Sequence, residues 1–196
     1  DIEKLCKEAI EYGFKGVCVN PSFVELAATL LKGKKPIVIA VVGFPFGASQ
    51  TSTKSFEAKE AVAAGAEEID MVINIGALKE KNYQLVYQDI CSVVNEVKPC
   101  VVKAIIETCY LDRDEKIIAS ALATVAGAKY IKTSTGFAEK GASAEDIKLI
   151  KSVVDNKVKI KASGGIKNYQ DALLMIEAGA DRIGSSSSVN IVTGNY

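Results

Sequence analysis

The sequence contains no histidine among its 196 residues. This absence excludes, within this chain, zinc sites with imidazole ligands, Ser-His-Asp triads and proton transfer by histidine. Lys+Arg and Asp+Glu are equal at 24 each, so the formal net charge is zero. No overall basic field therefore favours nucleic acid or an acidic membrane surface. No apolar run is long enough to span a bilayer. We expect no nucleic-acid partner and no membrane, while local sites for a small anion remain open.

The cysteines lack the spacing that is typical of metal sites or disulfide frameworks. There are five of them, and they lie within apolar patterns: Cys6, Cys18, Cys91, Cys100 and Cys109. Reduced, mostly packed thiols of this kind are typical of cytoplasmic proteins. The sequence thus predicts a cytoplasmic protein without disulfides.

Short apolar strands alternate with helical segments along the whole chain, which favours a parallel sheet covered by helices. The predicted strands are Gly16–Asn20, Pro36–Val42, Glu68–Asn74, Val101–Glu107, Tyr130–Ser134, Val158–Ser163 and Arg182–Ser185. The predicted helices are Asp1–Tyr12, Pro21–Leu31, Thr53–Ala64, Tyr83–Val97, Asp114–Ala126, Ala144–Val154 and Tyr169–Ala178. No linker divides the chain, so residues 1–196 are expected to form a single barrel domain.

Four predicted helices end in a similar phrase around a glycine and lead into a strand: Gly13, Gly65, Gly127 and Gly179. Glycine suits the left-handed position that closes a helix. The glycines are separated by 52, 62 and 52 residues, about two strand–helix units, and this repeat predicts a (β/α)8 TIM barrel. Seven strands are found and the chain begins with a helix, so the first strand is expected to be absent from this chain. A seven-stranded, partly open barrel is the alternative.

Several predicted strands carry charged residues where a plain core would have Val, Ile or Leu. The two-residue period of a strand places Asp70, Lys103, Glu107, Lys132 and Lys161 on faces that can point inward. Lysines near strand ends usually extend their ammonium groups to water. If these faces do point inward, burial and neighbouring positive charge would leave one amine partly neutral and nucleophilic. Asp70 could then move protons, directly or through a water molecule.

Glycine and serine follow the last three predicted strands. The loops contain Thr135-Gly136, Gly164-Gly165 and Gly184-Ser185-Ser186-Ser187-Ser188. Backbone N–H groups at glycines and hydroxyls of serines can bind an anion, and barrels of this type bind phosphate near their last strands. The alternative is that the glycines only form tight turns. Three such loops in succession favour a phosphate site.

Seven segments, in order along nearly the whole chain, resemble the deoxyribose-phosphate aldolase family: Val17–Pro21, Val42–Gly47, Glu68–Gly76, Lys103–Thr108, Lys132–Phe137, Lys161–Ile166 and Gly179–Gly184. The resemblance implies a class I aldolase that uses no metal and no cofactor. Its reaction would be the reversible cleavage of 2-deoxy-D-ribose 5-phosphate to D-glyceraldehyde 3-phosphate and acetaldehyde. It also implies a cytoplasmic homodimer or homotetramer.

The resemblance further implies roles for individual residues. Lys132 would form the Schiff base, Lys161 would lower the pKa of Lys132 and assist proton transfer, and Asp70 would be the acid–base carboxylate. The substrate phosphate would be bound by Gly136, Gly164, Gly165, Gly184, Ser186 and Ser187. Two alternatives stay open at this point. One is another Schiff-base sugar-phosphate aldolase, and the other is a phosphate-binding barrel that is inactive for lack of its first strand.

Overall fold

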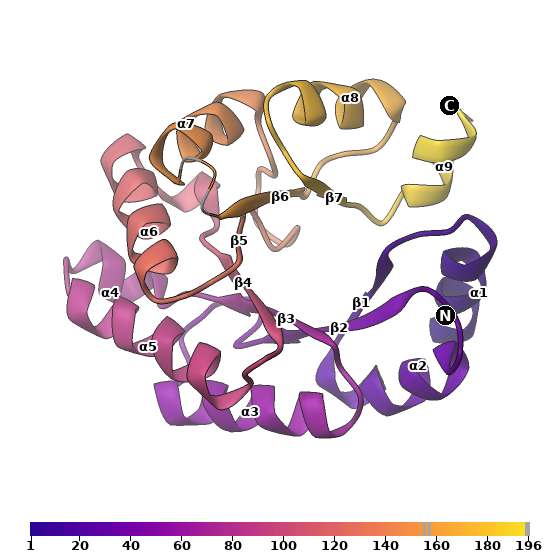
Figure 1. The fold of residues 1–196 in the computed structure, drawn as a ribbon. Helices are drawn as coiled ribbons and strands as arrows, with labels where there is room; N and C mark the ends of the chain where they lie inside the picture. Colours follow the sequence, from indigo (N-terminus) through magenta and orange to yellow (C-terminus); the bar gives the residue numbers. More distant parts are fainter. Residues whose placement is uncertain (155, 157, 195–196) are drawn as a thin grey trace.

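The computed structural model describes residues 1–154, 156 and 158–194. In this part of the chain seven strands form one parallel sheet, and each strand pairs with the next along the sequence. The strands are β1 (Gly16–Val19), β2 (Ile37–Val42), β3 (Glu68–Val72), β4 (Val101–Ile105), β5 (Tyr130–Lys132), β6 (Lys159–Ser163) and β7 (Arg182–Gly184). The sheet curls into an incomplete ring with β1 and β7 at its two ends (Figure 1).

Helices surround the outer face of the curled sheet (Figure 1). The α-helices of the described residues are α1 (Ile2–Glu11), α2 (Val24–Leu31), α3 (Thr51–Ala63), α4 (Ile75–Lys79), α5 (Tyr83–Glu96), α6 (Arg113–Val125), α7 (Ala144–Val154), α8 (Tyr169–Glu177) and α9 (Ser188–Thr193). Two short 3-10 helices are η1 (Pro21–Phe23) and η2 (Thr108–Tyr110). Each helix in this part of the chain is too short or too polar to cross a membrane.

The seven predicted strands are confirmed, but most of them end earlier than predicted. β3 stops at Val72 because Asn74 instead caps α4, where its side-chain oxygen accepts the N–H of Ala77 at 3.0 Å. β4 stops at Ile105 because Glu107 has left-handed backbone angles. The helices α4, α9 and η2 were not predicted from the sequence. All three lie directly after strands, so strand ends were the least accurate part of the prediction.

The four helix-closing glycines have the predicted conformation. Their φ angles run from 66° at Gly13 to 113° at Gly179, with Gly65 and Gly127 between these values. A residue with a Cβ atom rarely adopts this conformation, which glycine reaches without a steric penalty. The repeat therefore marks real helix ends, each of which turns the chain back toward the sheet.

The two faces of the sheet are buried against different surroundings. On β3, Ile69 and Met71 belong to the apolar core between the sheet and the helices. Glu68, Asp70 and Val72 alternate with them and are also buried, on the face inside the curl. The apolar side chains on the outer face stabilise the strand, by about 25 cal/mol for each Å² of apolar surface that they remove from water. The inner face does not have to supply this stabilisation and can therefore hold charged groups.

Candidate active site

Strand pairing brings charged residues together on the inner face. Asp70 on β3 lies opposite Lys103 on β4, and Lys132 on β5 lies opposite Lys161 on β6. All four residues are at most 4 % exposed. The strand faces do point inward, so the three lysines meet Asp70 inside the sheet as expected for that case, and the lysines have not extended their ammonium groups to water.

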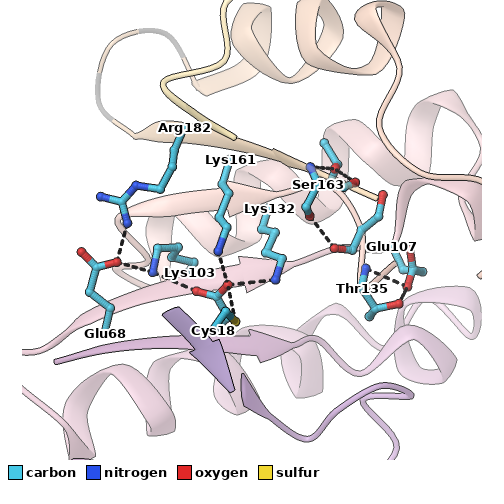
Figure 2. A network of polar contacts seen from close by, with 12 residues as sticks. Cys18, Glu68, Lys103, Glu107, Lys132, Thr135, Lys161, Ser163 and Arg182 are labelled. Atoms are coloured by element: carbon cyan, nitrogen blue, oxygen red, sulfur yellow. Dashed lines mark hydrogen bonds and ion pairs between the residues drawn. The ribbon is translucent and has the colours of Figure 1, made fainter. Parts of the chain in front are cut away.

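The Asp70 carboxylate is the centre of this cluster. Figure 2 shows the side chains of Lys103, Lys132 and Lys161 pointing toward one another from neighbouring strands. Its Oδ1 accepts a hydrogen bond from Lys103 Nζ at 2.8 Å. Its Oδ2 accepts from Lys132 Nζ at 2.8 Å and from Lys161 Nζ at 2.7 Å. Cys18 Sγ on β1 lies 3.8 Å from the same Oδ2. Two amines that share one oxygen can exchange a proton over a short distance.

Lys103 is held on its other side by a carboxylate that the sequence analysis missed. Glu68 Oε2 lies 2.5 Å from Lys103 Nζ and 2.5 Å from Arg182 Nη1 on β7. Arg182 also donates to the Tyr130 hydroxyl at 3.2 Å, and its guanidinium lies over that ring at 4.8 Å. Glu68 precedes Asp70 by two positions, so the strand period could have placed it on the same face.

The charges of the cluster shift its pKa values in opposite directions. Burial alone would raise the pKa of Asp70, but the three neighbouring ammonium groups hold it well below its usual range. Burial lowers the pKa of Lys161; Asp70 opposes this effect, and the positive charges of the other lysines add to it. At Lys132 burial also acts to lower the pKa, but the charge and hydrogen bond of Asp70, together with Cys18 and Glu107, outweigh burial and raise it.

The less basic amine of the pair is therefore Lys161. Asp70 opposes the effect of burial at both amines, and the positive charges of Lys132 and Lys103 add to burial at Lys161. The expectation that Lys161 lowers the pKa of Lys132 stays a prediction. Since its pKa lies well below its usual range, Asp70 is ionised at neutral pH, where it accepts hydrogen bonds from both amines.

Glu107 does not join the lysines, and the second carboxylate of the cluster is Glu68. The backbone of Glu107 is left-handed, with φ 53°, which is uncommon for a residue with a side chain. Its Oε2 accepts hydrogen bonds from the N–H and the hydroxyl of Thr135 (Figure 2). Its Oε1 is buried and has no partner among the described residues. Glu107 thus connects the end of β4 to the loop after β5.

The loops after β5 and β6 bring three predicted phosphate-binding glycines together. Gly136, Gly164 and Gly165 have φ angles of 90°, 81° and 76°. A Cβ atom on Gly164 would lie 3.4 Å from the Cα atom of Gly136, and one on Gly141 would lie 2.0 Å from the carbonyl oxygen of Gly164. Backbone packing this close requires glycine, so these residues form one continuous backbone surface.

The end of β7 adjoins these loops because Gly184 pairs with Ser163 on β6. A Cβ atom on Gly184 would lie 2.9 Å from Cε of Lys161, so this glycine gives the lysine side chain its space. The exposed Ser186 and the half-buried Ser187 follow in a turn, where the Ser187 N–H donates to Ser185 Oγ at 2.9 Å. The phosphate-binding role of this turn stays a prediction.

The site and the fold together indicate a class of enzyme. Buried amines beside a carboxylate are arranged for attack on a carbonyl carbon and for the proton transfers that follow. A curled parallel sheet with outer helices supports such groups on its inner strand faces. Among the residues that the structure describes, no group of three or more His, Cys, Asp or Glu side chains could hold a metal ion. These features define a barrel-like α/β protein with buried lysines beside a carboxylate on the inner face of its sheet.

Comparison with known proteins identifies the family. The model of the DeoC/LacD family aldolases matches residues 1–194. A deoxyribose-phosphate aldolase of Thermotoga maritima is 57 % identical over 194 residues, which cover 99 % of this chain and 78 % of that protein. One of Natranaerobius thermophilus is 59 % identical over 192 residues, 97 % of this chain and 87 % of that protein. The chain belongs to the DeoC/LacD aldolase family and is an aldolase, a carbon–carbon lyase.

Solved structures agree with this assignment. A putative deoxyribose-phosphate aldolase from Coccidioides immitis has a TM-score of 0.96 and 46 % identity, and the match covers 98 % of this chain and 78 % of that one. A deoxyribose phosphate aldolase from Aeropyrum pernix, described as having a unique tetrameric structure, has a TM-score of 0.92 and 31 % identity. That match covers 99 % of this chain and 82 % of the other. The curled parallel sheet with outer helices is thus shared with solved structures of aldolases.

Proposed function

We propose that this chain cleaves 2-deoxy-D-ribose 5-phosphate reversibly to D-glyceraldehyde 3-phosphate and acetaldehyde through a Schiff base on Lys132. The curated relatives at 57 % and 59 % identity are named deoxyribose-phosphate aldolase. The observation that carries the proposal is the contact of Lys132 Nζ and Lys161 Nζ with the same Asp70 oxygen, at 2.8 and 2.7 Å. Such an arrangement gives one amine a nearby base and a nearby anion.

Lys132 becomes a nucleophile by losing a proton. Lys161 has the lowered pKa and is the base available beside it, and Asp70 Oδ2 lies between the two amines. The neutral Lys132 attacks the aldehyde carbon of the open-chain sugar, and loss of water gives an iminium ion. The ionised Asp70 carboxylate, which is the acid–base carboxylate of this proposal, stabilises the positive charge that develops on nitrogen.

Carbon–carbon cleavage follows from the iminium ion. A base removes the proton of the hydroxyl at C3, the C2–C3 bond breaks, and its electron pair moves to the iminium nitrogen as an enamine. Glyceraldehyde 3-phosphate leaves with the new carbonyl. Protonation of the enamine at C2 and hydrolysis by water release acetaldehyde and restore the Lys132 amine. Lys161, working with Asp70 and water, is the group placed to carry these protons.

The phosphate of the substrate is bound by the loops after β5, β6 and β7 in this proposal. The residues are Gly136, Gly164, Gly165, Gly184, Ser186 and Ser187. Support comes from the positive φ angles of Gly136, Gly164 and Gly165 and from the close backbone packing of Gly136 with Gly164, because glycines in such loops let backbone N–H groups approach an anion. No metal and no cofactor takes part in the proposed reaction.

We further propose that residues 1–196 belong to one (β/α)8 barrel domain, in which a further strand lies between β1 and β7. The two strands form the ends of the described sheet, and unpaired sheet edges are normally covered in natural proteins. An added strand would pair with both edges and close the barrel.

The assembly and location of the protein are also proposals. The tetrameric relative from Aeropyrum pernix supports a homo-oligomer, a dimer or a tetramer, for this chain. All five cysteines are free, which supports the reducing environment of the cytoplasm. The partners are the sugar phosphate and the aldehydes, with no nucleic acid and no membrane.

Reductive trapping tests the proposed function. Acetaldehyde and sodium borohydride should add one ethyl group to the wild-type protein, and peptide mass spectrometry should locate it on Lys132. Lys132→Met should abolish both the adduct and the cleavage of 2-deoxyribose 5-phosphate. Lys159→Met changes an exposed lysine on β6 and should leave both unchanged.

Two results would contradict the proposal. Labelling of Lys161 in place of Lys132 would exchange the roles of the two amines. Trapping of the wild-type protein by other carbonyl donors, without cleavage of the deoxyribose ester, would indicate a different sugar-phosphate aldolase.

A further inference from the structure

The two oxygens of the Asp70 carboxylate are used unequally. Oδ2 receives both Lys132 and Lys161, while Oδ1 receives Lys103 alone. A carboxylate has room for about four hydrogen bonds distributed over both oxygens. With two amines and two oxygens, the lower-energy arrangement would give each amine an oxygen of its own. Lys103 prevents this arrangement by occupying Oδ1.

Lys103 is itself fixed in place from both sides. It is fully buried on β4, opposite Asp70, and its ammonium lies 2.5 Å from Glu68 and 2.8 Å from Asp70. Glu68 is in turn held by Arg182 at 2.5 Å. Glu68 and Asp70 lie on the same face of β3, so the Lys103 ammonium is held between the two carboxylates. Figure 2 shows Glu68 in contact with both Lys103 and Arg182.

Stability does not explain this arrangement. Apolar side chains of similar volume often replace buried ion pairs with no loss of stability, because desolvation of the charges offsets their attraction. Lys103 also adds a third ammonium close to Lys132 and Lys161, where the positive charges repel one another. A group that costs free energy at this place is better explained by what it does to Asp70.

We propose that Lys103, held by Glu68, is a positioning residue that reserves Oδ1 of Asp70 and so makes both reacting amines converge on Oδ2. This inference rests on the proposed lysine-dependent cleavage. Without Lys103, the Asp70 carboxylate can rotate and bind Lys132 through one oxygen and Lys161 through the other. The amines then separate, and the proton no longer passes between them over one shared oxygen.

Substitution of Lys103 by methionine tests the proposal. Methionine keeps most of the volume and removes the ammonium. We expect Lys103→Met to lower kcat about 100-fold, the loss typical of misplaced catalytic groups. KM should change less than about twofold, because Lys103 lies away from the proposed phosphate loops. Lys54→Met is the matched control, since Lys54 is also fully buried in an ion pair but lies on α3. Its kcat should equal that of the wild-type protein at a temperature where it is folded.

The pH profile provides a readout that a merely structural role would not change. Lys161 is faced by Asp70 from β3, Lys132 from β5, Lys103 from β4 and Cys18 from β1. Removal of the Lys103 charge raises the pKa of Lys161, so the acid limb of the kcat/KM profile should move to higher pH. Lys54→Met should not move this limb.

Glu68→Gln is the second variant, for the case that Lys103→Met fails to fold. This variant keeps Lys103 but removes the carboxylate charge of Glu68 that holds the Lys103 ammonium in place. The value of kcat should therefore fall less than in Lys103→Met, while KM stays constant. Unchanged kcat and an unmoved acid limb in a folded variant would overturn the positioning role while the proposed function stands. Absence of both the borohydride adduct and the cleavage in the wild-type protein would instead overturn the proposed function.

Discussion

Two regions of the molecule bury lysines, and the contrast between them separates structure from chemistry. On the helix side of the sheet, Lys54 of α3 forms an ion pair with Asp89 of α5 at 2.6 Å. Its ammonium also donates to the carbonyl oxygen of Val72 at 2.9 Å, and the Thr51 hydroxyl donates to the other Asp89 oxygen at 3.1 Å. One cation meets one anion, and the polar atoms of the pair are satisfied. This region joins two helices to the end of β3.

On the inner face the charges do not balance. Lys103, Lys132, Lys161 and Arg182 face the two carboxylates of Asp70 and Glu68. Full protonation would leave an excess of positive charge in a buried site, so one amine loses its proton more easily than an ordinary lysine. A one-to-one buried pair supports the fold, whereas a surplus of amines on one carboxylate supplies a base.

The largest expected effect comes from the carboxylate at the centre of the unbalanced cluster. Asp70→Asn removes the charge that both amines share, so kcat for cleavage of 2-deoxyribose 5-phosphate should fall about 10²–10⁴-fold, the usual range for an acid–base group. The measurement is steady-state kinetics on protein whose circular dichroism matches the wild type. A loss of kcat of less than twofold would mean that the inner cluster, like the Lys54–Asp89 pair, serves only the fold.

The balanced pair should show the opposite behaviour. Asp89→Asn leaves the Lys54 ammonium buried without its anion, which should lower the free energy of unfolding by about 3–5 kcal/mol. Urea denaturation measures this change, and kcat should be unchanged at a temperature where the variant is folded. The double variant Lys54→Met with Asp89→Leu should recover most of the stability, because no charge is then left unpaired. A large loss of kcat in either variant would show that this pair also serves the reaction.

Gly184→Ala tests how closely Lys161 must be held. The new methyl group would lie 2.9 Å from the Lys161 Cε atom, so the side chain has to shift. The end of a lysine moves at low cost in stability, and the thermal unfolding temperature should change little. Since a displacement of about 1 Å at a catalytic group can cost about 100-fold in rate, kcat should fall about 10- to 100-fold. Unaltered kcat would mean that the precise position of Lys161 is unimportant.

The smallest expected effect is on the pH dependence of stability. The pKa values of Asp70 and Glu68 are held below their usual values in the folded protein. The stability that they contribute is present above their unfolded pKa values, about 4. It is lost as the pH falls through the folded values. Urea denaturation between pH 3 and pH 7 should show this loss, and Asp70→Asn should flatten the curve. An unchanged slope in that variant would contradict the pKa assignment.

The arrangement of strands could be predicted because the pattern that encodes it is local. The seven apolar segments and the glycines at helix ends fixed the alternation of elements and their order in the sheet. The ends of β3 and β4 could not be predicted, since a side-chain cap at Asn74 and the left-handed backbone of Glu107 ended them. These are short-range features, but they depend on how the chain leaves the sheet.

The candidate site was predicted in part. The strand period placed Asp70 and the three lysines on inner faces, and the structure brings them together. The same reasoning chose Glu107 as the second carboxylate, where the structure has Glu68. The part that Arg182 plays in the site could not be predicted from the sequence, because a charged residue at the start of an edge strand is usually exposed. Its role became visible only through its contact with Glu68 across 114 positions of sequence.

The sequence by itself determined which side of each strand carries charge, because successive side chains of a strand point to opposite faces whatever surrounds them. Only the tertiary structure decided which oxygen each amine meets and which amine has the lowered pKa. These properties depend on distances between atoms of residues far apart in the sequence, such as Asp70 and Lys161, which are 91 positions apart. Burial and Coulomb interactions act through space, so the curl of the sheet turned a row of lysines into a site where one of them can act as a base.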